Sequence, residues 1–122
     1  MTNNQLPTKN KFDLEERTTN FARKVVKLCK SLPRNPINDR IVGQVVGSSG
    51  SIGANYREAN DALGKKDFIM RMKISRKESK ESIHWLILLA DANTERAIEI
   101  KELESEANEC KNIFSAIINK TV

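Results

Sequence analysis

The sequence has few aromatic residues and almost no histidine. Aromatic residues make up 5% of the 122 residues, and His84 is the single histidine. Most zinc sites need several imidazole or thiolate ligands. Di-iron bundles need two Glu-x-x-His pairs, of which this chain has one, Glu81 with His84. We therefore expect no metal, no cofactor and no enzymatic activity, and we interpret His84 as a surface or interface residue.

Cysteines and long apolar runs are also scarce. Cys29 and Cys110 lie far apart in unrelated contexts, and the first ten residues lack the apolar core of an export signal. The longest apolar run, residues 85–90, falls far short of the roughly 20 residues of a membrane span. We expect a cytoplasmic protein with reduced thiols and no membrane partner.

What the sequence does contain is helical periodicity. Apolar residues recur at alternating steps of three and four, as in the seams of helix bundles. The pattern predicts an all-α, antiparallel up-down four-helix bundle spanning residues 12–122, after a disordered tail at residues 1–11. The expected helices are roughly 13–32, 38–62, 65–92 and 97–120, and the assignment of residues 94–102 to the last helix or to its connection stays open.

Local signals suggest where the first two helices begin. Asp13 and Glu16 have the spacing of an acidic capping box, and Asn38 can cap the second helix. The glycine-serine segment at residues 47–53 has the propensity of a loop. However, Gly43, Gly47, Gly50 and Ala54 share one helical face, on which another backbone could approach closely. We therefore place this segment on the second helix.

Positive charge is concentrated in two of the expected helices. The chain has a formal net charge of +5. Residues 11–36 hold seven Lys or Arg against three acids, residues 65–80 hold seven against two, and residues 95–111 hold three against six. Helical spacing aligns two basic stripes, Arg23, Lys27, Lys30 and Arg34 on the first helix and Lys73, Lys77 and Lys80 on the third.

Such stripes can follow a phosphate backbone and release its counterions. They are equally consistent with solubilising faces, or with ion-pair partners for the acidic fourth helix. No aromatic residues are interleaved with the basic ones, so stacking on single-stranded bases is not indicated.

The sequence also resembles a bacterial protein family. The resemblance lies in motifs at residues 12–18, 21–22, 28–33, 44, 51–59, 66–68, 77–82 and 85–86. These resemble the four helix bundle protein family, whose members are also described as encoded in intervening sequences of large-subunit ribosomal RNA genes. One departure is Gly47, where the family usually has a basic residue.

The resemblance implies a four-helix bundle that assembles as a homopentamer and has no catalytic residues. A relative similar in fold, the accessory variability protein of diversity-generating retroelements, works with a reverse transcriptase and binds nucleic acid. The resemblance also places residues 51–56 on the second helix. It suggests packing or hydrogen-bonding roles, within the bundle or between subunits, for Asn55, Tyr56, Glu58, Glu78, Glu81 and Trp85.

Two functions follow as expectations. The first is a non-catalytic oligomeric scaffold that binds RNA or DNA through the two basic stripes, largely without reading its sequence. The alternative is an adaptor for a protein partner, such as a polymerase, a reverse transcriptase or a ribosomal component.

Overall fold

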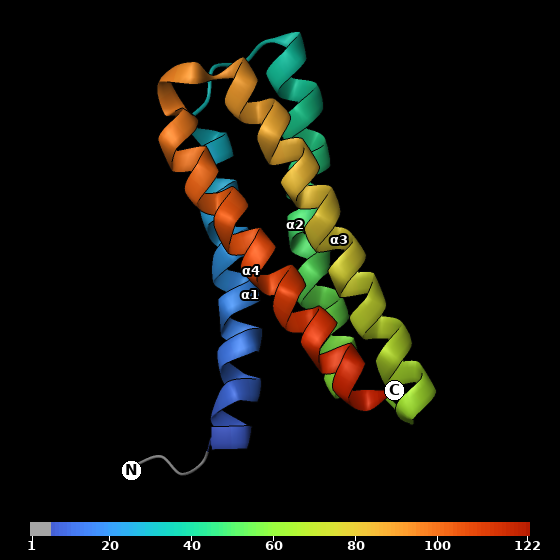
Figure 1. Ribbon diagram of the computed structural model, residues 1–122. Coiled ribbons are helices and arrows are strands. Elements are labelled where there is room, and N and C mark those ends of the chain that lie inside the picture. The colour runs from blue at the N-terminus through green and yellow to red at the C-terminus, as the bar shows by residue number, and fades with distance from the viewer. Residues whose placement is uncertain (1–5) are drawn as a thin grey trace.

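In a computed structural model that describes residues 6–122, the chain forms a four-helix bundle (Figure 1). Its helices are α1 (Leu6–Lys30), α2 (Pro36–Asn60), α3 (Lys65–Ala92) and α4 (Ala97–Thr121). A 3-10 turn, η1 (Thr94–Arg96), precedes α4 and assigns the start of residues 94–102 to the connection. The described residues contain no strand, and the predicted all-α bundle is confirmed.

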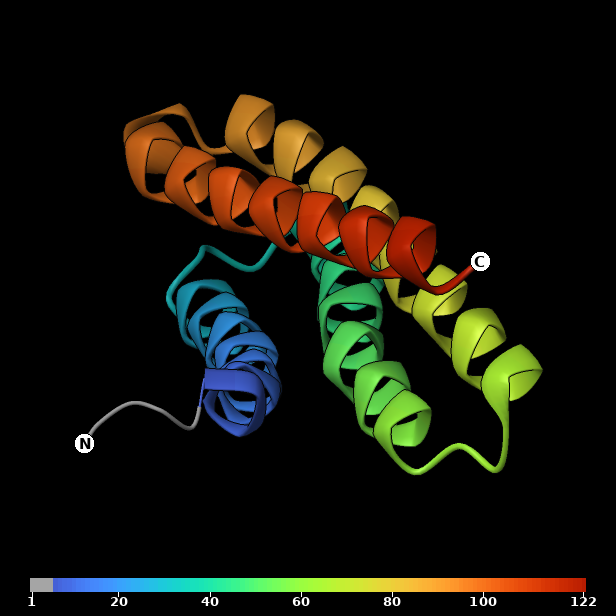
Figure 2. The same cartoon turned by 60° about the horizontal axis from the view of Figure 1, so that its bottom comes forward.

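The core is formed by the predicted apolar seams. Its largest fully buried side chains include Phe21 of α1, Ile52 of α2, Met72 of α3 and Phe114 of α4. α3 packs extensively against both α2 and α4, whereas α1 packs on α2 and touches α4 along a short stretch only. α1 and α3 are therefore diagonal in the bundle, and Figure 2 shows them on opposite sides of α2.

The prediction for the start of α1 was wrong. The helix begins at Leu6 rather than near Asp13, so residues 6–11 are helical. Asp13 and Glu16 consequently lie inside the helix, where no free backbone N–H groups remain for them to cap. The tail prediction for residues 1–5 lies outside the described residues.

The assignment of Asn38 as the cap of α2 was also wrong. The N-cap is Asn35, whose Oδ1 accepts a hydrogen bond from the Asn38 backbone N–H at 2.8 Å. Pro36 follows at the first helical position, where a missing N–H costs nothing and the fixed φ favours the helix. The Asn38 side chain is instead buried.

α2 and α3 approach each other along a seam of small polar residues. Ser48, Ser75 and Ser82 are all buried between them. Ser82 Oγ donates to Ser48 Oγ at 2.9 Å, and Ser75 Oγ donates across the interface to the Ile52 carbonyl at 3.0 Å. Because each buried hydroxyl finds an acceptor, this polar interface carries little desolvation penalty.

α1 is held close to α2 by a different glycine from those predicted. A Cβ added at Gly53 would lie 2.9 Å from Thr18 Oγ1 and 3.4 Å from Thr18 Cβ, so only hydrogen fits there. Thr18 is fully buried, and its hydroxyl donates to the Leu14 carbonyl at 2.9 Å. The glycine-serine segment is helical as expected, but Gly53 is the position in it where the helices approach most tightly.

A reciprocal pair of amides joins the two helix connections at one end of the bundle. Asn38 Nδ2 donates to Asn93 Oδ1 at 3.0 Å, and Asn93 Nδ2 donates to Asn38 Oδ1 at 2.9 Å. The same amides also donate to the Pro33 and Leu89 carbonyls. Both side chains are buried, so this clamp ties the α1–α2 connection to the end of α3.

We predict opposite effects for two glycine substitutions in α2. Gly53→Ala should destabilise the fold by about 1–3 kcal/mol, because the new methyl group overpacks against Thr18. Within a single chain, Gly50→Ala should stabilise the fold by about 0.5–1 kcal/mol, because a Cβ at that position meets nothing within 4 Å of the same chain and alanine favours the helix. Chemical denaturation measures both changes. Thr18→Ala combined with Gly53→Ala should recover part of the loss; the same sign for both single variants would contradict this account.

The amide clamp leads to a second prediction. Asn38→Ala and Asn93→Ala should each cost about 1–3 kcal/mol of unfolding free energy, because each leaves the buried amide oxygen of the other asparagine without its donor, although that amide keeps its bond to a backbone carbonyl. The double variant should lose less than the sum of the two, since the second substitution removes the orphaned group. Asn108→Ala, on the exposed side of α4, serves as the control and should change little. Strictly additive losses at Asn38 and Asn93 would show that the pair is not coupled.

Candidate nucleic-acid interface

The first basic stripe lies on the outer side of α1. Arg23, Lys27 and Lys30 are exposed, on the side of the helix opposite the buried Phe21 and Val25. Arg23 Nη1 donates to Asn20 Oδ1 at 2.9 Å. Among the described residues, no carboxylate forms an ion pair with these three cations. We name Arg23, Lys27 and Lys30 the α1 basic face.

Arg34 does not belong to this face. α1 ends at Lys30, and Arg34 lies in the connection to α2. Its guanidinium forms two hydrogen bonds with the Asp39 carboxylate, at 2.7 and 3.2 Å. The Arg34 hydrogen bond holds the pKa of Asp39 below its usual value, so the pair stays ionised and its net charge is zero. The prediction of Arg34 as a stripe member is therefore wrong.

The second stripe lies on the outer side of α3. Lys73, Lys77 and Lys80 are exposed and have no ion-pair partner among the described residues. We name them the α3 basic face. Shallow grooves beside them are also lined by Lys66, Arg76 and His84 and by the apolar residues Ile69, Met70 and Ile74.

Sequence reasoning missed Lys66, Arg76 and His84 as neighbours of this face. The signal was present for two of them, since Lys66 precedes Lys73 by seven residues and His84 follows Lys77 by seven, which is two helical turns. The position of His84 on the surface is as predicted.

The structure does not bring the two basic faces together within one chain. α1 and α3 are diagonal, and their described residues make no contact with each other. α1 uses one flank to reach α2, where Glu15 accepts from Arg57 at 3.1 Å, and the other flank to reach α4. The α1 basic face lies between these flanks, with Arg23 and Lys30 on the outer side of the helix and Lys27 at the border with the α1–α4 cleft.

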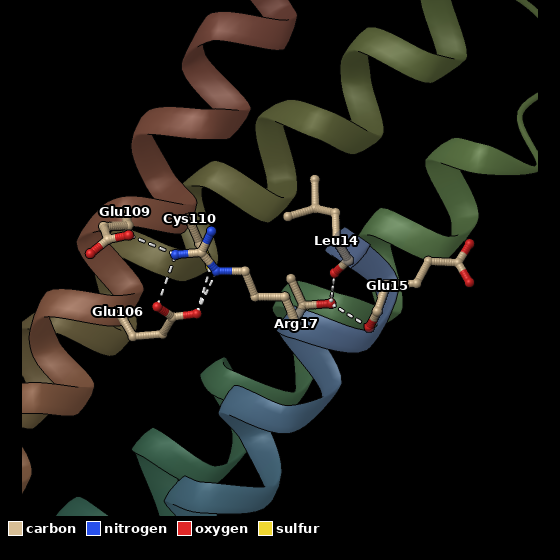
Figure 3. A network of polar contacts seen from close by, with 7 residues as sticks. Leu14, Glu15, Arg17, Glu106, Glu109 and Cys110 are labelled. Atoms are coloured by element: carbon tan, nitrogen blue, oxygen red, sulfur yellow. Dashed lines mark hydrogen bonds and ion pairs between the residues drawn. The ribbon is translucent and has the colours of Figure 1, made fainter. Parts of the chain in front are cut away.

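The acids of α4 bind a different cation from those predicted. Arg17 extends from α1 towards α4 (Figure 3), where Nε donates to Glu106 at 2.7 Å and Nη2 donates to Glu109 at 2.7 Å. The hydrogen bond with Glu106 raises the pKa of Arg17 further above its already high value. Arg17 is thus the main polar bridge between α1 and α4.

A cleft of about 920 Å³ opens between α1 and α4 where the helices separate. Phe21, Leu28 and Leu103 line its floor, and Lys24 and Lys27 lie on its α1 wall. Its α4 wall is acidic, with Glu99, Glu102 and Glu106. The Arg17 bridge lies at one part of this cleft, and at another Arg96 Nη1 donates to Ser31 Oγ, just after the end of α1, at 3.0 Å.

The small-residue face of α2 does not pack within the bundle. Gly43, Gly47, Gly50 and Ala54 are exposed, and a Cβ at any of the three glycines would meet nothing within 4 Å. Their predicted role in packing inside the bundle is wrong, because Ser48, Ile52 and Gly53 form the inward side of α2 instead. A role between subunits stays a prediction.

Two of the other predicted packing residues contact the bundle. Tyr56 is buried and its ring centroid lies 6.1 Å from that of Phe114. Asn55 Oδ1 accepts from Arg71 Nη1 of α3 at 3.1 Å. Glu58 is exposed on α2.

The remaining predicted residues lie on α3. Glu78 is half-buried, which raises the pKa of its carboxyl, and Glu81 is exposed. Trp85 is half-buried, with its ring centroid 4.9 Å from that of His84. The Trp85 Nε1–H is enclosed and has no acceptor among the described residues.

Neither cysteine shows the environment of a reactive thiol. Cys29 and Cys110 are free and buried, as expected. Burial raises the pKa of each to about 11, so both stay protonated at neutral pH. The described residues hold no group of three or more His, Cys, Asp or Glu side chains that could bind a metal ion. Within that same part of the chain, no helix is long and apolar enough to cross a membrane.

Comparison with known proteins identifies the family. Residues 10–116 match the model of the 23S rRNA-intervening sequence protein family. The chain belongs to this family. Its fold matches a solved structure from Bacteroides thetaiotaomicron, described as a protein with unknown function from the S23 ribosomal protein family. That match has a TM-score of 0.75 and 29% identity, and covers 86% of this chain and 97% of the other.

No curated protein matches the chain. The family match confirms the resemblance to proteins encoded in intervening sequences of ribosomal RNA genes. The relation to retroelement accessory proteins stays a prediction.

Proposed function

We propose that this family member is a non-catalytic oligomeric scaffold that binds nucleic acid through the basic faces of α1 and α3. The observation that carries the proposal is the exposure of six cations without ion-pair partners among the described residues. Lysine and arginine side chains in this state can replace the counterions of a phosphate backbone, which supplies most non-specific affinity.

The length of these faces suits a phosphate backbone. Lys73 and Lys80 are seven residues apart, or about 10 Å along the helix axis, and Lys66 extends the cationic row to about 21 Å. With phosphates about 3.4 Å apart along each strand of a duplex, the longer row spans about six base pairs. The grooves beside the lysines are lined mainly by aliphatic and charged groups, which favours backbone contacts over base stacking.

The family description points to RNA as the nucleic acid. The matched family takes its name from intervening sequences of 23S ribosomal RNA, and the solved relative is assigned to a ribosomal protein family. We therefore take duplex RNA as the first ligand to test, with DNA as the second.

We further propose that the scaffold is a cytoplasmic homo-oligomer, with a pentamer as the expected state. The exposed Gly43, Gly47, Gly50 and Ala54 form a surface to which a second backbone can come close. The free cysteines suit a reducing compartment. Light scattering of the purified protein measures its mass, and a monomer at all concentrations would contradict the assembly.

One observation favours the alternative function of a protein adaptor. Met70 is 47% exposed and lies with Ile69 and Ile74 in a groove on α3. Exposed apolar side chains bordered by lysines also fit an amphipathic, acidic partner segment. Capture of one defined protein after nuclease treatment, together with no RNA binding at low salt, would favour the adaptor over the scaffold.

The proposed function predicts that the affinity for RNA falls as the salt concentration rises. It also predicts that this affinity comes from the residues of the two basic faces. Changing all six residues, Arg23, Lys27, Lys30, Lys73, Lys77 and Lys80, to Gln should remove most of the binding of a 20-base-pair RNA duplex. Each face should contribute a slope of about −3 to the plot of log K against log salt, because it offers three phosphate contacts. Fluorescence anisotropy between 25 and 200 mM salt measures these slopes.

The control removes charge from α4 instead. Lys101→Gln, Lys111→Gln and Lys120→Gln together remove three positive charges outside both basic faces. The affinity of this control variant for the RNA duplex should match that of the unaltered protein. If net charge alone governed binding, the control would lose about half of the free energy that the six-residue variant loses. Unaltered binding by the six-residue variant would refute the assignment of these faces.

A further inference from the structure

The two basic faces are directed to opposite sides of the bundle. On α3, Ser75 bonds to α2 and Arg76 Nη1 donates to Ser115 of α4 at 3.4 Å, so both flanks of the helix are occupied. The α3 basic face lies between these flanks, on the side away from the axis. α1 occupies the diagonal position in the bundle (Figure 2). Its cations Arg23, Lys27 and Lys30 are likewise exposed.

The surfaces between the faces do not continue the positive charge. On the side of α4, the exposed acids Glu99, Glu102 and Glu109 would repel a phosphate backbone. On the side of α2, the exposed Gly43, Gly47 and Gly50 are uncharged, and the exposed charges balance, with Arg40 and Arg57 against Asp39 and Glu58. A nucleic-acid strand bound at one face therefore meets an acidic or a neutral surface before it reaches the other.

A duplex is also too stiff to reach both faces. The persistence length of DNA is about 50 nm, many times the width of two helices packed 8–10 Å apart. One duplex therefore cannot bend around the bundle from α1 to α3. If both faces bind, they bind separate segments.

We propose that the protein bridges two nucleic-acid segments, with one bound at the α1 basic face and another at the α3 basic face of the same chain. This inference rests on the proposed function, but it adds an activity, the joining of two helical segments of one RNA or of two RNA molecules. It requires no change in conformation, since both faces are presented at once.

The test measures bridging and binding separately. One 20-base-pair RNA duplex carries biotin and a second carries a fluorophore; the full-length protein is added at low salt, and fluorescence captured on streptavidin reports bridging. Anisotropy of the labelled duplex alone reports binding and stoichiometry. The variants are the α1-face variant (Arg23→Gln, Lys27→Gln, Lys30→Gln), the α3-face variant (Lys73→Gln, Lys77→Gln, Lys80→Gln) and the α4 control.

The unaltered protein and the α4 control should capture the fluorescent duplex. Each face variant should still bind duplex with a similar affinity for the remaining face, but at half the number of duplexes per chain. Because the other subunits of an oligomer keep copies of the remaining face, capture of the second duplex should fall to about half and not to background. Circular dichroism checks that each variant keeps its helical content.

Two results would overturn the inference. If the unaltered protein binds duplex but captures no second duplex, bridging is absent while the proposed function stands. If one face variant abolishes both binding and capture and the other changes neither, a single face repeated around an oligomer is responsible. Absence of any salt-sensitive binding would instead refute the proposed function itself.

Discussion

The close approach of α2 and α3 is the constraint on which the rest of the molecule depends. Serine side chains occupy their interface, and the Ser75 hydroxyl reaches the backbone of α2 directly. Larger side chains would force these helices apart, because protein interiors are close-packed. With this pair in place, the bulky residues Met72 and Phe114 fill the space towards α4, and α1 closes the bundle through Thr18 against Gly53.

This arrangement determines where charge can lie. α3 contacts two helices and has one outward side, while α1 contacts α2 closely and is joined to α4 mainly by the Arg17 bridge. Burying an unpaired lysine would cost several kcal/mol. The lysines of both helices therefore lie outward, and because α1 and α3 are diagonal, the two basic faces are separate. The acids of α4 are used to hold α1 and do not neutralise either face.

The sequence allowed prediction of most of the fold because its apolar residues keep a helical period. The bounds of α3, 65–92, were predicted correctly, and those of α4 to within one residue. The start of α1 was missed because residues 6–11 carry no periodic pattern. Asn35 could have been preferred over Asn38 as the cap, since the following Pro36 is typical of a first helical position.

The packing of α2 was harder to predict because both of its sides carry small residues. Helical spacing does separate the two sets, because Ser48 and Ser49 share a face with the apolar Ile41, Val45 and Ile52, whereas Gly43, Gly47 and Gly50 lie on the opposite face. The contact of Gly53 with Thr18 could not be predicted from spacing, because it depends on the position of α1. The sequence predicted the members of the two basic faces and wrongly added Arg34 to the first. Its ion pair with Asp39 depends on the turn that brings the two side chains together. Their opposite orientation required the helix order around the bundle.

The central claim is that phosphate contacts occur at the outer faces of α1 and α3 and not elsewhere. Acetylation of lysines, followed by mass spectrometry with and without bound RNA duplex, tests it most directly on the unaltered protein. The account predicts protection of Lys27, Lys30, Lys73, Lys77 and Lys80, with Lys101 and Lys120 of α4 modified equally in both states. Equal protection of the α4 lysines, or unchanged modification of all five face lysines at a salt concentration where RNA is bound, would contradict it.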